Sequence, residues 1–126
     1  MGLGWRFVFD QTRSFHPLLI GGSQWATELS LPEAKQLSLG IVQLVDQHKS
    51  ISTSLLPEET ITLEFESSFN QGKSTIWICL EGTFSSWCLR FILTPSSENR
   101  AFEASWDQNA SMAIALVLED FLREYN

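Results

Sequence analysis

The sequence predicts an α+β fold with antiparallel sheets and two helices, in the order βββα-ββββα. Seven short stretches are predicted to be strands, and two of them, 4–9 and 60–66, alternate apolar and polar residues with the period of a half-buried strand. Two longer stretches repeat their apolar residues at helical spacing, and each follows a run of the strand-like stretches. The chain has 126 residues, a length that suits a single domain with a core of its own.

The first half of the chain predicts three strands and a helix. The expected strands cover residues 4–9, 15–20 and 24–29. Ser30 and Glu33 have the spacing of a capping box, and Pro32 suits a first helical turn. A helix is therefore expected over about 31–48, where apolar residues recur at helical spacing.

A double glycine, Gly21-Gly22, separates two of these strands. One interpretation is a phosphate cradle, but such a loop feeds the N-terminus of a helix. Here the glycines lead into a strand, and no lysine follows closely. Because Gly-Gly supplies the positive φ angles of two-residue turns, the pair is predicted to form a hairpin turn.

The second half predicts four strands and a second helix. The expected strands cover residues 60–66, 74–81, 87–94 and 100–106. Loop chemistry separates them at Asn70-Gln71-Gly72 and at 95–99. From Gln108 to Tyr125 the period becomes helical, and Asp107 suits the positive end of that helix dipole.

The order of elements indicates a doubled unit. Each half, 1–55 and 56–126, is expected to contain strands closed by one helix. A short sequence similarity supports this, since Ala26–Ser30 (ATELS) precedes the first predicted helix and Ala101–Ser105 (AFEAS) precedes the second. An approximate internal repeat within one domain is therefore predicted.

Composition narrows the function classes. The net charge is −7, from 8 basic and 15 acidic residues, which lowers the expectation of binding to a phosphate backbone. No apolar run approaches the roughly 18–20 residues of a membrane span, and no signal-peptide pattern opens the chain. We therefore expect a cytoplasmic protein without membrane contact.

Four segments carry a family resemblance. They are GWR near the start, LLIGG…WATELS before the first helix, LLPEETITLEFE after it, and RAFEASW before the last helix. Together they resemble a cyanobacterial family known only as a domain of unknown function, over nearly the whole chain. The resemblance implies a fold like the single-stranded-DNA-binding transcriptional regulators, the class of the Whirly proteins and a eukaryotic transcriptional coactivator. That class doubles a unit of strands followed by a helix, whereas the first half here has three strands instead of four. The family of unknown function has no established catalytic or binding residues that could be assigned to this chain.

Two of the five tryptophans are candidates for a partly exposed binding platform. Trp5 and Trp87 share a strand phase with other large apolar residues and are expected in the core. Trp77 lies on the opposite phase from its apolar neighbours, and the phase of Trp25 is ambiguous. Exposed aromatic rings on a sheet can stack nucleic-acid bases. The alternative is that Trp25 and Trp77 pack under a loop or a helix.

Basic residues on the strands are few. The expected strands carry Arg6 and Arg90 as candidates for a nucleic-acid contact. The same strands carry the carboxylates Glu28, Glu64, Glu66, Glu81 and Glu103. These carboxylates repel a phosphate backbone, and the more ordinary role of the two arginines is cross-strand pairing with them.

The inventory for catalysis and metal binding is thin. Cys79 and Cys88 are expected on one face of a hairpin as two free thiols, with a redox pair as the alternative. Two cysteines without nearby histidines do not make a zinc site, so no metal and no cofactor are expected. His16 and His48 have no nucleophile in a recognised motif. We therefore expect no catalytic residues and no enzyme.

Two functions remain open. One is a regulatory module that contacts single-stranded nucleic acid near Trp25 and Trp77, with help from Arg6 and Arg90. The other is a protein–protein interaction or assembly module, for which the negative charge is no obstacle and a contiguous apolar surface patch is expected. A doubled unit within one chain favours a monomer over a homodimer.

Overall fold

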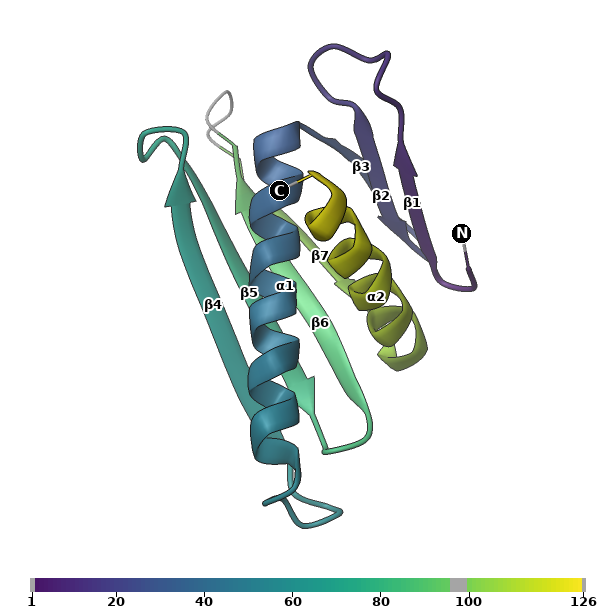
Figure 1. Ribbon diagram of the computed structural model, residues 1–126, viewed down its shortest axis with the longest axis vertical. Coiled ribbons are helices and arrows are strands. Elements are labelled where there is room, and N and C mark those ends of the chain that lie inside the picture. The colour runs from purple at the N-terminus through teal and green to yellow at the C-terminus, as the bar shows by residue number, and fades with distance from the viewer. Residues whose placement is uncertain (1, 96–99, 126) are drawn as a thin grey trace.

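The computed structural model describes residues 2–95 and 100–125, and it confirms the α+β fold with the order βββα-ββββα (Figure 1). The first three strands and the last four form two separate antiparallel sheets. The elements are β1 (Trp5–Phe9), β2 (Leu18–Gly22), β3 (Ala26–Leu29), α1 (Leu31–Ser52), β4 (Ile61–Phe69), β5 (Ser74–Gly82), β6 (Trp87–Thr94), β7 (Phe102–Trp106) and α2 (Gln108–Tyr125). Of the loop expected at 95–99, residues 96–99 lie outside the described part of the chain.

Both helices lie on the same side of the sheets (Figure 1). Helix α1 packs over β4 and β5, and α2 packs over β6, β7 and β1. The helix of the first half therefore covers the sheet of the second half. Its approach is close because residue 40 is glycine, and a Cβ there would overlap the side chains of Phe65 and Ile78.

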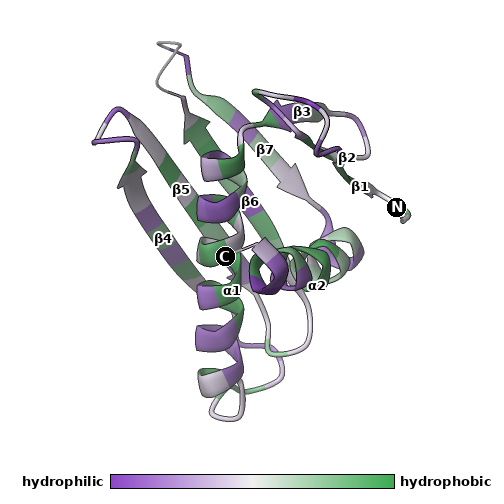
Figure 2. Cartoon of the chain, turned by 45° about the horizontal axis from the view of Figure 1, so that its top comes forward, coloured by the Kyte–Doolittle hydropathy of each residue, from purple (hydrophilic) through white to green (hydrophobic). Residues whose placement is uncertain are grey.

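The core lies between the helices and the inner face of the four-stranded sheet. Leu80, Leu89 and Phe91 on the sheet are completely buried, as are Ile41 of α1 and Ile114 of α2. The alternation of hydrophobic and hydrophilic residues is visible along the strands in Figure 2. One face of each strand thus enters the core and the other is left outside.

Of the two tryptophans expected in the core, one is buried and the other is partly buried against it. Trp87 is buried on the inner face of β6. Trp5 is partly buried and packs against the core from β1.

The predicted helix starts are confirmed. Ser30 Oγ accepts from Glu33 N at 3.3 Å, and Glu33 Oε1 accepts from Ser30 N at 2.8 Å, which completes the capping box of α1. At α2, Asp107 Oδ1 accepts from Ala110 N at 2.8 Å. Each carboxylate or hydroxyl satisfies an amide that has no partner within its helix.

Helix α1 continues to Ser52, four residues beyond the expected end at 48. The hydroxyl of Ser50 donates to Gln47 O at 2.8 Å, and that of Ser52 donates to Lys49 O at 3.0 Å. The second bond satisfies one of the last four carbonyl groups of the helix, which lack amide partners. The hydroxyl groups of Ser50 and Ser52 therefore stabilise the last turn of α1.

The predicted turn at Gly21-Gly22 is wrong. Both glycines are the last residues of β2, opposite Arg6 and Trp5 of β1, and the chain reverses over 23–25. Neither glycine has a positive φ angle. Their small size is needed for another reason: a Cβ on Gly22 would overlap the Trp25 indole, and one on Gly21 would lie 2.8 Å from Trp25 O. Close approach of Trp25, not turn geometry, explains the pair.

Two other strand boundaries move by three residues. Strand β2 begins at Leu18 instead of 15, and Pro17 immediately before it has no N–H to give to a ladder. Strand β4 extends to Phe69, which pairs with Ser74 of β5. The loop predicted at 70–72 lies between β4 and β5, and all three of its residues have positive φ angles.

Candidate functional site

The outer face of the four-stranded sheet is the candidate site. We define it as the side chains of β4–β7 that point away from the helices. Its members are Thr62, Glu64, Glu66, Ser68, Thr75, Trp77, Cys79, Glu81, Cys88, Arg90, Ile92, Thr94, Glu103 and Ser105. No helix covers this face, because α1 and α2 both pack on the opposite one. The outer face therefore exposes the side chains that alternate with the core-facing residues of each strand.

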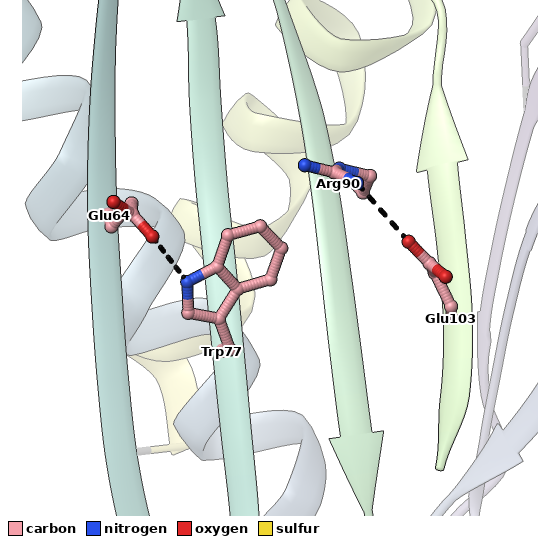
Figure 3. A network of polar contacts seen from close by, with 4 residues as sticks. All are labelled: Glu64, Trp77, Arg90 and Glu103. Atoms are coloured by element: carbon pink, nitrogen blue, oxygen red, sulfur yellow. Dashed lines mark hydrogen bonds and ion pairs between the residues drawn. The ribbon is translucent and has the colours of Figure 1, made fainter.

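Four of these residues form a connected row across all four strands (Figure 3). The indole N–H of Trp77 donates to Glu64 Oε1 at 2.7 Å. The guanidinium carbon of Arg90 lies 5.0 Å from the centre of the Trp77 ring, within cation–π range. On the far side, Arg90 Nη1 lies 3.3 Å from Glu103 Oε2. The partly exposed indole is thus held in one orientation by a carboxylate and an arginine.

The charge of the outer face is negative. Its strands carry four carboxylates, those of Glu64, Glu66, Glu81 and Glu103, and one basic side chain, that of Arg90. Both partners of the Arg90–Glu103 pair are about half exposed, so water screens this pair. The cross-strand pairing predicted for Arg90 is confirmed, and it leaves the face with an excess of acid.

The two cysteines lie on this face, as predicted, and both are free thiols. Cys79 is opposite Arg90, and Cys88 is opposite Glu81, so the two thiols are diagonal neighbours. Diagonal positions have Cα atoms about 7–8 Å apart, which is too far for an unstrained disulfide. Burial raises the pKa of both thiols, Cys79 being only 5% exposed. A raised pKa keeps them protonated and unreactive near neutral pH.

Trp25 lies elsewhere, at the junction of the two sheets. Its ring centre is 5.3 Å from that of Trp106, 5.8 Å from that of Phe102 and 5.9 Å from that of Phe91. Its indole N–H donates to Ser105 O at 2.9 Å. The protein itself therefore contacts the ring that was a candidate for stacking.

Arg6 is also separate from the outer face. It lies on β1 in the three-stranded sheet, opposite Gly21. Among the described residues, no carboxylate oxygen comes within 4.0 Å of it, and Glu28 pairs instead with Arg13. The structure brings Trp77 and Arg90 together, and it leaves Trp25 and Arg6 outside that group.

Sequence reasoning named two members of the row and missed the roles of Glu64 and Glu103. Both were noted as strand carboxylates, but not as partners of particular side chains. A hairpin register alone would not have identified them, since Glu66 is directly opposite Trp77 and Ser105 is directly opposite Arg90. The contact from Trp77 to Glu64 is a diagonal one, which long side chains reach across a pleated sheet.

A second surface feature is a hollow between α1 and α2. It is lined by Val42, Val45, Lys49, Trp87, Met112, Ala115, Leu116 and Glu119. Met112 and Leu116 are exposed, and the lining is mostly apolar. An apolar surface of this kind is what the protein-interaction hypothesis expects.

The two histidines lie in different environments. His48 is buried and its Nε2 lies 2.9 Å from Thr83 O, while His16 is exposed. Within residues 2–95 and 100–125, no three His, Cys, Asp or Glu side chains gather as metal ligands would. In the same part of the chain, neither helix is long and apolar enough to cross a membrane.

Comparison with known proteins places the chain among uncharacterised relatives. The family model of DUF1818, a domain of unknown function, matches residues 1–121. A crystal structure at 1.80 Å of a protein of unknown function from Prochlorococcus sp. NATL2A, described as a DUF155 family member, is 33% identical. That structure aligns with a TM-score of 0.83 over 96% of this chain and 95% of the other. No protein with a curated description matches. Neither match links the chain to the single-stranded-DNA-binding regulators.

Proposed function

We propose that this chain, which belongs to the DUF1818 family of unknown function, is a non-catalytic protein-interaction module of the cytoplasm. The outer face of its four-stranded sheet would bind a basic segment of a partner protein. The observation that carries the proposal is the acidic surround of Trp77, where four carboxylates accompany one arginine. Two unpaired thiols on that face are consistent with a reducing compartment.

The row in Figure 3 supports a basic ligand in a specific way. Arg90 already occupies the place that a ligand cation would take, over the Trp77 ring and beside Glu103. A guanidinium is therefore accommodated by this ring and these carboxylates. Because Arg90 is half exposed, a partner's lysine or arginine can compete with it for the Trp77 ring.

Single-stranded nucleic acid is the competing hypothesis, and Trp77 with Arg90 is the observation in its favour. A base could stack on the exposed part of the Trp77 ring. The surrounding carboxylates oppose it, since each one adjacent to a phosphate is repulsive at low salt. We therefore rank protein interaction above nucleic-acid binding.

The substitution Arg90→Ala separates the two hypotheses because they predict opposite signs. The probes are a nine-residue peptide of alternating valine and lysine, capped at both ends, and a single-stranded oligo(dT), each titrated by calorimetry at two salt concentrations. Loss of Arg90 removes a competing cation, so peptide affinity should rise about three- to tenfold, as expected for one or two exposed charge contacts. If the face binds DNA, oligo(dT) affinity should fall by a similar factor.

Arg123→Ala is the matched control. Arg123 pairs with Asp120 on α2, so the substitution changes net charge equally at a distance from the outer face. It should leave peptide affinity within about twofold of the wild type, because exposed charges more than about 10 Å away are screened. Saturable oligo(dT) binding that Arg90→Ala weakens, together with no peptide binding, would overturn the proposal.

A further inference from the structure

Strand β4 forms a free edge of the four-stranded sheet. The strand order is β4-β5-β6-β7, and within the described residues no strand pairs with the other side of β4 (Figure 1). It is nine residues long and pairs with β5 one to one, without a bulge. At the opposite edge, β7 is joined to the three-stranded sheet by the indole N–H of Trp106, which donates to Gly21 O at 3.0 Å. Within the described residues, β4 is therefore the edge of this sheet that offers a long open ladder of backbone donors and acceptors.

Edge strands of natural sheets are usually protected by lysine, proline, bulges or short length. Strand β4 (ITLEFESSF) has none of these four features. What it does carry is two carboxylates, Glu64 and Glu66, side by side on the outer face. Negative charge, and not a bulge, a proline or short length, therefore limits which strands can pair with this edge.

These two carboxylates disfavour the pairing of β4 with β4 of a second copy of the chain. In an antiparallel pair of two β4 strands with their inner faces on the same side, each register that pairs at least seven of the nine residues places Glu64 or Glu66 opposite Glu64 or Glu66 of the other copy. Like charges directly opposite each other destabilise a strand pair. The same two carboxylates favour an incoming strand with basic residues at those positions.

We infer that β4 accepts an extended basic segment of a partner protein as a fifth strand. Its lysine or arginine side chains, at every second position, would lie on the outer face opposite Glu64 and Glu66. Its alternate apolar side chains would extend the inner face beside Leu63 and Phe65, which are only partly buried. Backbone hydrogen bonds supply affinity in such strand addition, and the alternating side chains supply specificity. The inference rests on the proposed function and adds the binding mode to it.

Backbone methylation of the probe tests the binding mode. Two versions of the valine–lysine peptide are made, one N-methylated at every lysine and one at every valine. In an added strand, only one class of residue directs its N–H toward β4. One version should therefore lose at least about 30-fold in affinity, through lost hydrogen bonds and steric conflict, while the other stays within about threefold of the parent.

The outcomes distinguish this inference from the proposed function. If both methylated peptides bind like the parent, the segment docks through side chains alone; the inference is then overturned and the proposed function stands. If the parent peptide itself does not bind, both the inference and the proposed function are overturned.

Charge variants supply an independent check. Glu64→Gln with Glu66→Gln should weaken the parent peptide about three- to tenfold, because two exposed pairs are lost. The control Glu119→Gln removes one negative charge from α2, on the other side of the sheet. It should leave the affinity for the parent peptide within about twofold of the wild type. Equal affinity for the wild type and the double variant would overturn the inference.

Discussion

Trp25, just before β3, and Trp77, within β5, are both partly buried, but they make opposite kinds of contact. The Trp25 indole donates to a backbone carbonyl and lies within 6 Å of three aromatic rings of the other sheet. The Trp77 indole donates to a carboxylate and has an arginine as the contact over its ring. The first joins two sheets, whereas the second belongs to a solvated polar row. A tryptophan's contribution to stability thus depends on what covers its ring, and not on the strand phase that carries it.

The largest difference in the free energy of unfolding is expected between the variants that remove the Trp25 ring and the Trp77 ring. We expect Trp25→Ala to lower the free energy of unfolding by about 3–4 kcal/mol, because it deletes an aromatic side chain from a packed junction. Trp77→Ala should cost less than about 1 kcal/mol, since its ring faces solvent and polar groups. Urea unfolding followed by circular dichroism measures both. Equal losses would abolish the distinction between the two rings.

The next largest effect concerns the glycine beneath Trp25. Gly22→Ala should destabilise the protein by about 1–3 kcal/mol, because the added methyl group overlaps the indole and forces a shift in a packed region. In a Trp25→Ala background the same substitution should cost much less, since the overlapping atoms are gone. A double-mutant cycle measures this coupling; additive losses would show that the glycine serves the backbone and not the ring.

A smaller effect is expected for the polar row. Arg90→Ala should lower the free energy of unfolding by about 0.5–1 kcal/mol, the worth of one exposed ion pair and one partly exposed cation–π contact. Raising the salt concentration should shrink this difference, because screening weakens exposed charge pairs. A loss above about 2 kcal/mol that salt does not change would make the outer face a structural element.

The smallest effect involves the buried thiol of the outer face. Burial raises the Cys79 pKa above its ordinary value of 9.0, so the unfolded chain loses this proton at lower pH than the folded chain. The thiol's contribution to stability is complete below about pH 9 and is lost as pH rises through the folded-state pKa. The free energy of unfolding should thus fall less between pH 8 and pH 10 for Cys79→Ala than for the wild type. Parallel pH profiles would refute the claim.

Local sequence patterns predicted much of the secondary structure. The strand over 87–94 and the helix from Gln108 to Tyr125 have their predicted bounds, because period and flanking residues agree there. The cross-strand partner of Arg90 was also foreseeable as a carboxylate, since acidic residues dominate the neighbouring strands. The acidic character of the candidate face follows from the same strand phases.

The sequence by itself thus determined the alternation of the strands, the helix starts and the charge of the outer face, because each depends on residues a few positions apart. Tertiary structure alone decided that Gly21 and Gly22 end a strand, that Trp25 is covered, and that β4 is left as an open edge. The Trp25 bond spans 80 residues of chain, and α1 covers a sheet formed entirely by later residues. Such contacts arise only when distant elements pack, so no local pattern contains them.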